Sequence, residues 1–186
     1  QGILRVESYE TYRNPVHFDE LPGEKKKLTE VQQEIADDFI RSYDAGDRTP
    51  VLLHGITGSG KTEVYMEMID AMLQRGKQCI VLIPEIALTY QTLLRFYKRF
   101  GDAVSVMHSR LSAGERYDQM KRAKRGEVQV MIGPRSALFT PFQKLGLIII
   151  DEEHETSYKS DSMPKYHARE VAVHLAEMTD ACVVMG

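Results

Sequence analysis

Apolar residues along this chain follow a pattern that predicts a sheet of short strands. Runs rich in Val, Ile and Leu occur as PVLLH, QCIVLI, AVSVM, VQVMI, LGLIII and ACVVM. Continuous apolar strands of this kind are typical of a parallel sheet that is covered on both faces. The predicted strands span residues 50–54, 78–83, 103–107, 128–132, 145–150 and 181–185.

Helical spacing fills most of the gaps between these strands. Val31, Ile35, Phe39 and Tyr43 lie four residues apart and the segment closes at Gly46, which predicts a helix with one buried stripe and a glycine stop. The sequence therefore predicts an α/β fold, a mostly parallel β-sheet with helices on both faces. The other predicted helices span residues 61–75, 87–99, 112–125 and 167–178.

Residues 1–27 differ from the rest of the chain. They contain Pro15, Pro22, Gly23 and a lysine run, with one alternating patch, LRVESY, that can pair as an edge strand. We interpret residues 1–27 as a linker or lead-in and residues 28–186 as one domain, because the length suits a single α/β core. The sequence stops directly after an apolar strand, so we expect it to be a fragment of a larger protein.

Composition excludes several classes of protein. The formal net charge of −3 gives no global basic field, so any contact with nucleic acid must be local. Cys79 and Cys182 lie in apolar runs without a CxxC pair, which argues against zinc and a disulfide framework. No apolar run has the length of a membrane span and no export leader is visible, so we expect a cytoplasmic protein.

The segment GITGSGKT, residues 55–62, has the spacing of a phosphate-binding loop between a strand and a helix. Glycines let the backbone wrap closely around phosphates, and its N–H groups supply fixed positive dipoles. Lys61 is expected to reach the β and γ phosphates, and the Thr62 hydroxyl to join the Mg²⁺ shell. The predicted cradle consists of Gly55, Ile56, Thr57, Gly58, Ser59 and Gly60.

A second group of polar residues follows the strand LGLIII, in the segment DEEH. Parallel strands present their carboxyl ends at one edge of a sheet, so Asp151 and Glu152 are expected at the edge that carries the phosphate loop. There Asp151 can hold Mg²⁺, and Glu152 can orient or deprotonate a water. Acids after a strand are by themselves more often a solvated loop; the phosphate loop reverses that preference.

Five segments together resemble the first motor lobe of superfamily 2 DExH helicases, in particular the primosomal replication-restart helicases. They are GITGSGKTEVY, LIPEIALTYQT, VMHSRLS, GPRSALFTPF and IIIDEEHETSYK with KYHAREVAV after it. The resemblance covers about Leu28 to Gly186 and implies a RecA-like P-loop NTPase domain that uses ATP and Mg²⁺. It implies that His154 links the nucleotide site to DNA-facing elements; a hydrogen-bonded loop histidine is the alternative.

Gln32 has two interpretations. By the resemblance, it matches the glutamine that reads adenine ahead of the phosphate loop. Thr29 and Gln32 also form the TxxQ pattern of a capping box at a helix start. Both interpretations stay open.

The resemblance also implies DNA contacts. Pro84, Glu85 and Thr89 belong to one segment that lies along a DNA strand in these motors, and Arg135 and Ser136 to another. Hydroxyls, backbone N–H groups and an arginine suit contacts with phosphates that do not depend on base sequence. A surface ion pair is the alternative for Arg135.

Residues 155–169 correspond to a loop that, in the family, couples DNA occupancy to hydrolysis. This chain has no tryptophan there, and Tyr158 and Tyr166 are the candidates for stacking on bases. Packing of both tyrosines in the core is the alternative. The basic segment KRAKR and the cluster Arg95, Lys98 and Arg99 are expected to be solvated helix faces rather than nucleic-acid patches.

The function implied by the resemblance is that of an ATP-driven 3′-to-5′ DNA helicase lobe that acts at stalled forks, on forked or single-stranded DNA. Primosome and single-strand-binding proteins are the expected partners, with zinc only in parts of the protein outside this chain, and an upstream DNA-binding region before residue 28. A nucleotide kinase is the alternative from another class. A third possibility is a nucleotide-binding module, since arginines from a second lobe are needed for rapid hydrolysis.

Overall fold

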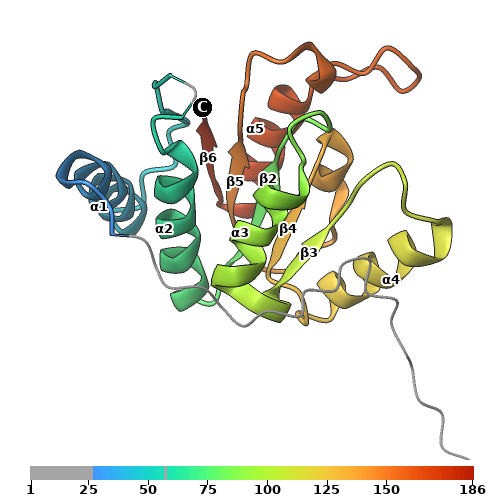
Figure 1. The fold of residues 1–186 in the computed structure, drawn as a ribbon, viewed down its shortest axis with the longest axis horizontal. Coiled ribbons are helices and arrows are strands. Elements are labelled where there is room, and N and C mark those ends of the chain that lie inside the picture. Colours follow the sequence, from blue (N-terminus) through green and yellow to red (C-terminus); the bar gives the residue numbers. More distant parts are fainter. Residues whose placement is uncertain (1–26, 57) are drawn as a thin grey trace, which may run out of the picture.

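Strands of the computed structural model, which describes residues 27–56 and 58–186, form one parallel sheet in the order β1-β6-β5-β2-β4-β3 (Figure 1). Each predicted strand segment overlaps one observed strand, and the strand predicted at residues 128–132 extends one residue further, so the predicted fold class is confirmed. The strands are β1 Val51–Leu52, β2 Gln78–Leu82, β3 Val104–Val106, β4 Val130–Gly133, β5 Leu145–Ile150 and β6 Cys182–Met185.

Helices connect the strands as the sequence pattern predicts. Three short 3₁₀ helices were not predicted, because a turn of three to five residues has too few positions to show a period. They are η1 Gly101–Ala103, η2 Arg135–Phe139 and η3 Thr156–Tyr158. The α-helices are α1 Glu30–Asp44, α2 Lys61–Gln74, α3 Tyr90–Phe100, α4 Ala113–Lys124 and α5 Ala168–Thr179.

The buried stripe of α1 differs from the predicted one. Ala36, Phe39 and Tyr43 are buried, whereas Val31 is 65% exposed. A spacing of four residues exceeds one helical turn, so Val31 is rotated from Tyr43 by about 120° around the axis. The stripe that packs against α2 instead follows spacings of three and four.

The sheet separates two apolar cores because side chains alternate between its faces. On one face, Val81 and Ile149 pack with residues of α1, α2 and α3. On the other, Ile80, Ile148 and Val183 pack with η2, Tyr158 and α5. Covering both faces leaves the loops at the strand ends as the surface where polar side chains can gather.

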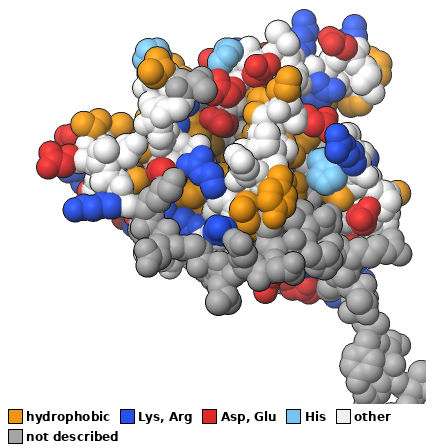
Figure 2. Space-filling view, in the orientation of Figure 1, with side chains coloured by type: hydrophobic (Ala, Val, Ile, Leu, Met, Phe, Trp, Pro, Cys, Tyr) orange, Lys and Arg blue, Asp and Glu red, His pale blue; other side chains and the backbone are white. Residues whose placement is uncertain are grey.

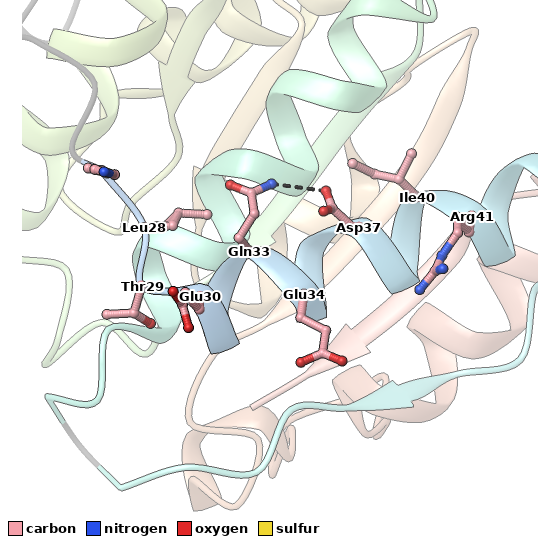
Figure 3. A pocket seen from close by; sticks show the side chains of 9 residues that line it. Leu28, Thr29, Glu30, Gln33, Glu34, Asp37, Ile40 and Arg41 are labelled. Carbon is pink, nitrogen blue, oxygen red and sulfur yellow. Dashed lines mark hydrogen bonds between the residues drawn. The ribbon is translucent and has the colours of Figure 1, made fainter.

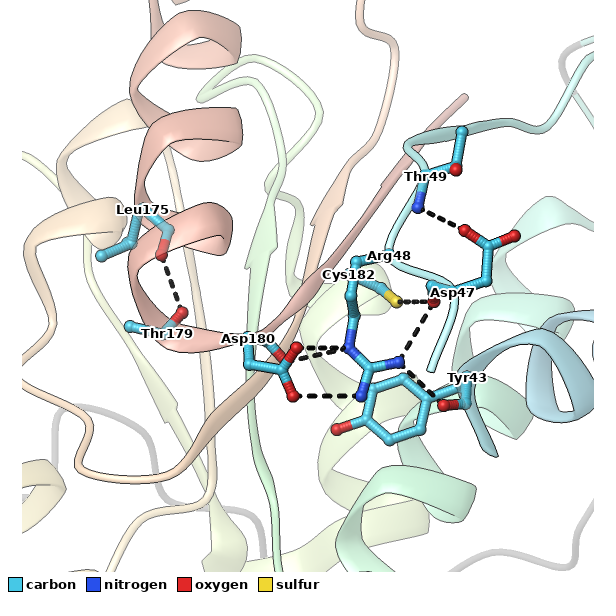
Figure 4. A network of polar contacts seen from close by, with 8 residues as sticks. All are labelled: Tyr43, Asp47, Arg48, Thr49, Leu175, Thr179, Asp180 and Cys182. Carbon is cyan, nitrogen blue, oxygen red and sulfur yellow. Dashed lines mark hydrogen bonds and ion pairs between the residues drawn. The ribbon is translucent and has the colours of Figure 1, made fainter. Parts of the chain in front are cut away.

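A polar network closes the edge of the molecule near β6 (Figure 4). The Arg48 guanidinium lies 4.0 Å from the centre of the Tyr43 ring and donates to the Tyr43 carbonyl. It also donates to the carbonyl and carboxylate of Asp180, which ends α5 with a positive φ of 54°. Arg48 therefore ties the end of α1 to the turn that leads into β6.

The predicted linker, including LRVESY, lies outside the described residues apart from Lys27, and its boundary at residue 28 stays a prediction. Among the residues that the structure describes, no helix is both long enough and apolar enough to cross a membrane.

Gln78 is a buried polar side chain that fixes three backbone groups at the start of β2. Its amide donates to the Val128 carbonyl at 3.2 Å, and its oxygen accepts from the N–H groups of Gln143 at 3.0 Å and Lys144 at 2.9 Å. Strand β2 lies between β4 and β5, so this side chain joins the chain segments that precede both neighbouring strands.

We expect Gln78→Leu to lower the free energy of unfolding by about 2–3 kcal/mol, because buried backbone groups lose their partners while apolar volume is kept. Urea unfolding followed by circular dichroism measures the change. Gln91→Leu on the exposed side of α3 is the matched control, with an expected change within ~0.5 kcal/mol. Equal stability of the two variants would contradict the role of Gln78.

Candidate functional site

The predicted phosphate loop connects β1 to α2. Gly58 and Gly60 have φ of +85° and +88°, which favours glycine, and a Cβ at Gly55 would lie 2.8 Å from Ser59 Oγ. Helix α2 begins at Lys61 with Gly60 as its N-cap, and no side chain caps it. Its first N–H groups are therefore suited to an anion.

Lys61 points back over this loop. Its Nζ donates to the Gly55 carbonyl at 2.8 Å, which holds the ammonium above the cradle rather than in solvent. Thr62 follows as the second residue of α2 and is partly buried. Thr57 lies outside the described residues, and the structure describes the other cradle residues predicted from the sequence.

Gln32 contributes to both of its predicted environments. The Thr29–Gln32 capping box is present, with Gln32 Oε1 accepting from the Thr29 N–H at 3.0 Å. Gln32 Nε2 donates to the Ser59 carbonyl at 3.1 Å, so the same side chain touches the phosphate loop. The capping role is confirmed, and adenine recognition stays a prediction.

The acids after β5 lie beside the phosphate loop, as predicted from strand direction. Asp151 Oδ1 accepts from the Tyr65 hydroxyl at 3.3 Å, and Tyr65 lies one turn after Lys61 on α2. The end of β6 lies between the loop and β5: a Cβ at Gly186 would be 1.9 Å from Tyr65 Oη and 3.3 Å from Lys61 Cδ. The structure therefore brings Lys61 and Asp151 to one site at the carboxyl edge of the sheet.

Burial raises the pKa of Asp151, and the neighbouring Glu152 carboxylate adds to this effect. The hydrogen bond from Tyr65 and the Lys61 ammonium act in the opposite direction but are the weaker influences. The pKa of Tyr65 is also raised, first by burial and then by the Asp151 charge. A divalent cation at Asp151 would supply the positive charge that this partly buried carboxylate lacks.

Glu152 and His154 form the outer part of the site. Glu152 has a positive φ of 50°, which turns the chain sharply after β5. His154 Nε2 lies 3.7 Å from Glu152 Oε2, with the His154 side chain exposed. The neighbouring Glu153 pairs with Arg169 at the start of α5, at 3.3 Å. Figure 2 shows Asp and Glu side chains interspersed with histidine and Lys or Arg side chains over the upper part of the molecule.

The segment after β2 has mixed exposure. Pro84 is buried, Glu85 is exposed, and Glu85 accepts hydrogen bonds from the backbone N–H and the hydroxyl of Ser109. These bonds lower the pKa of Glu85. The Thr89 hydroxyl caps α3 by accepting from the Thr92 N–H at 3.2 Å. The predicted DNA contacts at this segment are available only from its exposed residues.

The other predicted DNA-facing residues surround the loop after η3. Arg135 donates to the carbonyls of Ser157 and Lys159 and forms no ion pair with any other residue that the structure describes; Ser136 is exposed. Tyr158 is 1% exposed, which fits the alternative of core packing, since a buried ring cannot stack on a base. Tyr166 packs edge-on against Phe139, with centroids 5.6 Å apart.

The basic clusters are not the solvated helix faces that the sequence predicts, because several of their arginines pair with acids and the Arg99 side chain is only 9% exposed. Arg99 of α3 contacts Glu67 and Asp70 of α2, and Arg95 contacts Glu63. On α4, Arg122 lies 3.8 Å from Glu127. These arginines join helices and turns, so they do not indicate a patch that binds nucleic acid.

A hollow of about 1010 Å³ lies along α1, on the side that Figure 3 shows. Its lining includes the acids Glu30, Glu34 and Asp37, which would repel a triphosphate. This hollow is therefore unsuited to a triphosphate, and the carboxyl edge of the sheet remains the candidate site.

Two residues of the site were not predicted from the sequence. Tyr65 occupies an apolar stripe of α2, where a buried tyrosine looks like a core residue. Gly186 looked only like the last residue after a strand. The one available signal was the position of Tyr65, four residues after the lysine of the loop, which places both on one side of α2.

Comparison with known proteins extends these observations. Residues 25–186 match the family described as "Type III restriction enzyme, res subunit". The chain is 47% identical over 188 residues to the replication restart protein PriA of Bacillus subtilis (strain 168), covering 100% of this chain and 23% of that protein. It is 49% identical over 185 residues to PriA of Treponema pallidum (strain Nichols), with 100% and 25% covered.

The fold has a counterpart among solved structures. A structure of RecG bound to a three-way DNA junction superimposes with a TM-score of 0.64 at 23% identity, covering 86% of this chain and 21% of that chain. This likeness confirms the RecA-like fold. The chain spans at most a quarter of the length of the two PriA relatives.

We expect Asp151→Asn to raise the melting temperature at pH 8 by ~2–4 °C, or roughly 1 kcal/mol in a domain of this size. The raised pKa of Asp151 means that its favourable contribution is complete below the ordinary pKa of an aspartate. It is lost as the pH rises through the higher pKa of the folded state. The difference between variant and wild type should therefore shrink towards pH 4.

Thermal unfolding from pH 4 to pH 8 without added metal measures this difference, with the exposed Asp161→Asn as the control. A variant that is less stable than wild type at pH 8 would show that Asp151 is a stabilising partner of Tyr65 and Lys61 instead.

Proposed function

The chain belongs to the family described as "Type III restriction enzyme, res subunit", and we propose that it is the ATP-binding lobe of an ATP-dependent 3′-to-5′ DNA helicase of replication restart. Similarity to PriA over the whole chain supports this role. The observation that carries it is the approach of Lys61 to Asp151 at one edge of the sheet, bridged by Tyr65.

The residues present fit a magnesium-bound triphosphate. The backbone N–H groups of residues 55–60 and the uncapped start of α2 would hold phosphate oxygens. Lys61 would move from the Gly55 carbonyl to the β and γ phosphates, because phosphate is the stronger acceptor for an ammonium. Gln32, already placed against Ser59, would read adenine with its amide.

The Thr62 hydroxyl and the Asp151 carboxylate would hold the metal, because Mg²⁺ prefers oxygen ligands. When bound, Mg²⁺ supplies charge neutralisation for the phosphates. Glu152 would then orient a water and accept its proton. His154, beside Glu152, would link the nucleotide site to the DNA-facing loops.

DNA would lie across the loops that follow β2 and β4. Glu85, Thr89 and Ser136 are exposed there, and Pro84 is buried and would shape the backbone. Arg135 would contact a phosphate, and the partly exposed Tyr166 would stack with a base. Such contacts do not depend on sequence, as a motor that moves along DNA requires.

The lobe would act within a longer cytoplasmic protein. Primosome and single-strand-binding proteins would be partners of that protein, with zinc held outside this chain. The isolated lobe would serve as a nucleotide-binding module, because arginines that complete the γ-phosphate site come from a second lobe. Such an arginine contributes ~10³ to 10⁵ in rate in related phosphoryl-transfer systems.

We expect Lys61→Ala to weaken binding of Mg·ATP at least about 10-fold, because the cation that pairs with the phosphates is lost. Titration calorimetry with ATP and Mg²⁺ measures the affinity. Lys124→Ala, on the exposed face of α4, should bind as wild type does. Unchanged affinity after loss of Lys61 would argue against a phosphate role for this loop.

We expect the 186-residue chain to bind nucleotide with slow turnover, and the full-length protein to hydrolyse ATP on addition of forked DNA, ~10³-fold faster. Phosphate release measures both. Hydrolysis by the short chain at the full-length rate would overturn the need for a second lobe, and a phosphorylated small product would favour the nucleotide kinase.

A further inference from the structure

Arg135 grips the loop after the DEEH segment at two points. Its Nη1 donates to the Ser157 carbonyl at 2.8 Å and to the Lys159 carbonyl at 2.6 Å. These two carbonyls flank a single residue, Tyr158. The loop is further held by the Ser160 N–H, which donates to the Tyr166 carbonyl at 2.8 Å. Arg135 thus holds a backbone segment that is also restrained by the hydrogen bond from Ser160 to Tyr166.

Tyr158 connects that segment to the candidate metal ligand. Its ring is buried among the residues of the second core, and its hydroxyl lies 2.6 Å from the Asp151 carbonyl oxygen. The same hydroxyl lies 3.1 Å from the Leu82 carbonyl at the end of β2. A short path therefore runs from the guanidinium through one residue to the backbone of Asp151.

The other edge of the guanidinium is suited to a phosphate. Both N–H bonds of Nη1 are directed at the loop carbonyls, which leaves Nε and Nη2 as a second, forked edge. Within residues 27–56 and 58–186, neither of these two nitrogens has a protein acceptor. An arginine edge of this kind binds a phosphate with two parallel hydrogen bonds.

We propose that Arg135 and Tyr158 are positioning residues which couple a DNA phosphate to Asp151. Phosphate bound on one edge of the guanidinium would fix the hydrogen bonds from Arg135 to the Ser157 and Lys159 carbonyls. Tyr158 would then hold the backbone of Asp151, and with it the Asp151 carboxylate, in the orientation that binds metal. This inference rests on the proposed helicase function and assigns Tyr158 to the metal site rather than to base stacking.

The chemistry of the link explains why a buried tyrosine occupies this position. A phenylalanine would fill the same core volume but would leave the Asp151 carbonyl without this donor. Groups that orient a metal ligand affect metal affinity about 10- to 100-fold when they are removed. The link therefore predicts an effect on Mg²⁺ dependence that packing alone does not.

The test uses the full-length protein and two conservative substitutions. Tyr158→Phe removes only the hydroxyl. Arg135→Lys keeps a positive charge for phosphate but loses the planar guanidinium, whose Nη1 reaches both carbonyls while its forked edge stays available to a phosphate. DNA-stimulated ATP hydrolysis is measured against Mg²⁺ concentration, and DNA affinity is measured by fluorescence anisotropy.

We expect Tyr158→Phe to raise the Mg²⁺ concentration for half-maximal hydrolysis about 10-fold, with DNA affinity within about twofold of wild type. Arg135→Lys should keep DNA affinity within about threefold and lower the ratio of DNA-stimulated to unstimulated rate about 10-fold. The double variant should be no worse than the poorer single variant, because both substitutions break one path.

Tyr117→Phe on α4 and Arg125→Lys at its C-cap, both at exposed positions, are matched controls that should behave as wild type. Unchanged Mg²⁺ dependence in Tyr158→Phe would overturn the coupling. So would a double variant whose loss of DNA-stimulated hydrolysis equals the product of the losses in the two single variants. Thermal unfolding of each variant shows how much of it is folded. The Mg²⁺ dependence of hydrolysis by the folded fraction then decides the result. A wild-type protein without DNA-stimulated hydrolysis would instead contradict the proposed function.

Discussion

The structure depends on one close approach, between the lysine of the phosphate loop and the acid that ends β5. Strands β1 and β5 are not neighbours, since β6 lies between them, so the two side chains meet across the end of a third strand. Gly186 occupies that end, and any side chain there would collide with Tyr65. A half-buried carboxylate, a tyrosine hydroxyl and an ammonium thus share a space in which burial makes charge costly and a metal-bound phosphate would be favoured.

Other polar groups serve to fix the parts that this approach requires. Gln78 satisfies backbone groups beside β2, and Arg48 joins α1 to the turn before β6. The Tyr158 hydroxyl closes the carboxyl edge, because it lies within hydrogen-bonding distance of the backbone oxygens of Leu82, which ends β2, and Asp151, which follows β5. Each lies at a strand or helix end, where the ladder of the sheet stops and backbone groups need side-chain partners. The edge that carries the site is therefore held from several directions.

Much of this arrangement could be predicted from residue patterns. Continuous apolar runs identified the strands, and glycine stops after helical stripes located helix ends such as Gly46. The phosphate loop and the acids after β5 were recognisable because their chemistry requires particular residues at fixed spacing. Val31 was misplaced because a four-residue spacing drifts around a helix, and the 3₁₀ helix that carries Arg135 was missed because it is too short to show a period.

By itself the sequence determined the order of the strands and α-helices, the phosphate loop and the edge of the sheet on which its acids would lie. These follow from local rules: side-chain period, turn chemistry and the common direction of parallel strands. Only the tertiary structure decided that β6 separates β1 from β5, that Tyr65 reaches Asp151, and that Tyr158 faces the core while Arg135 faces its backbone. Those facts depend on contacts between residues far apart in the chain, and no local pattern encodes which distant backbone oxygen a side chain will meet.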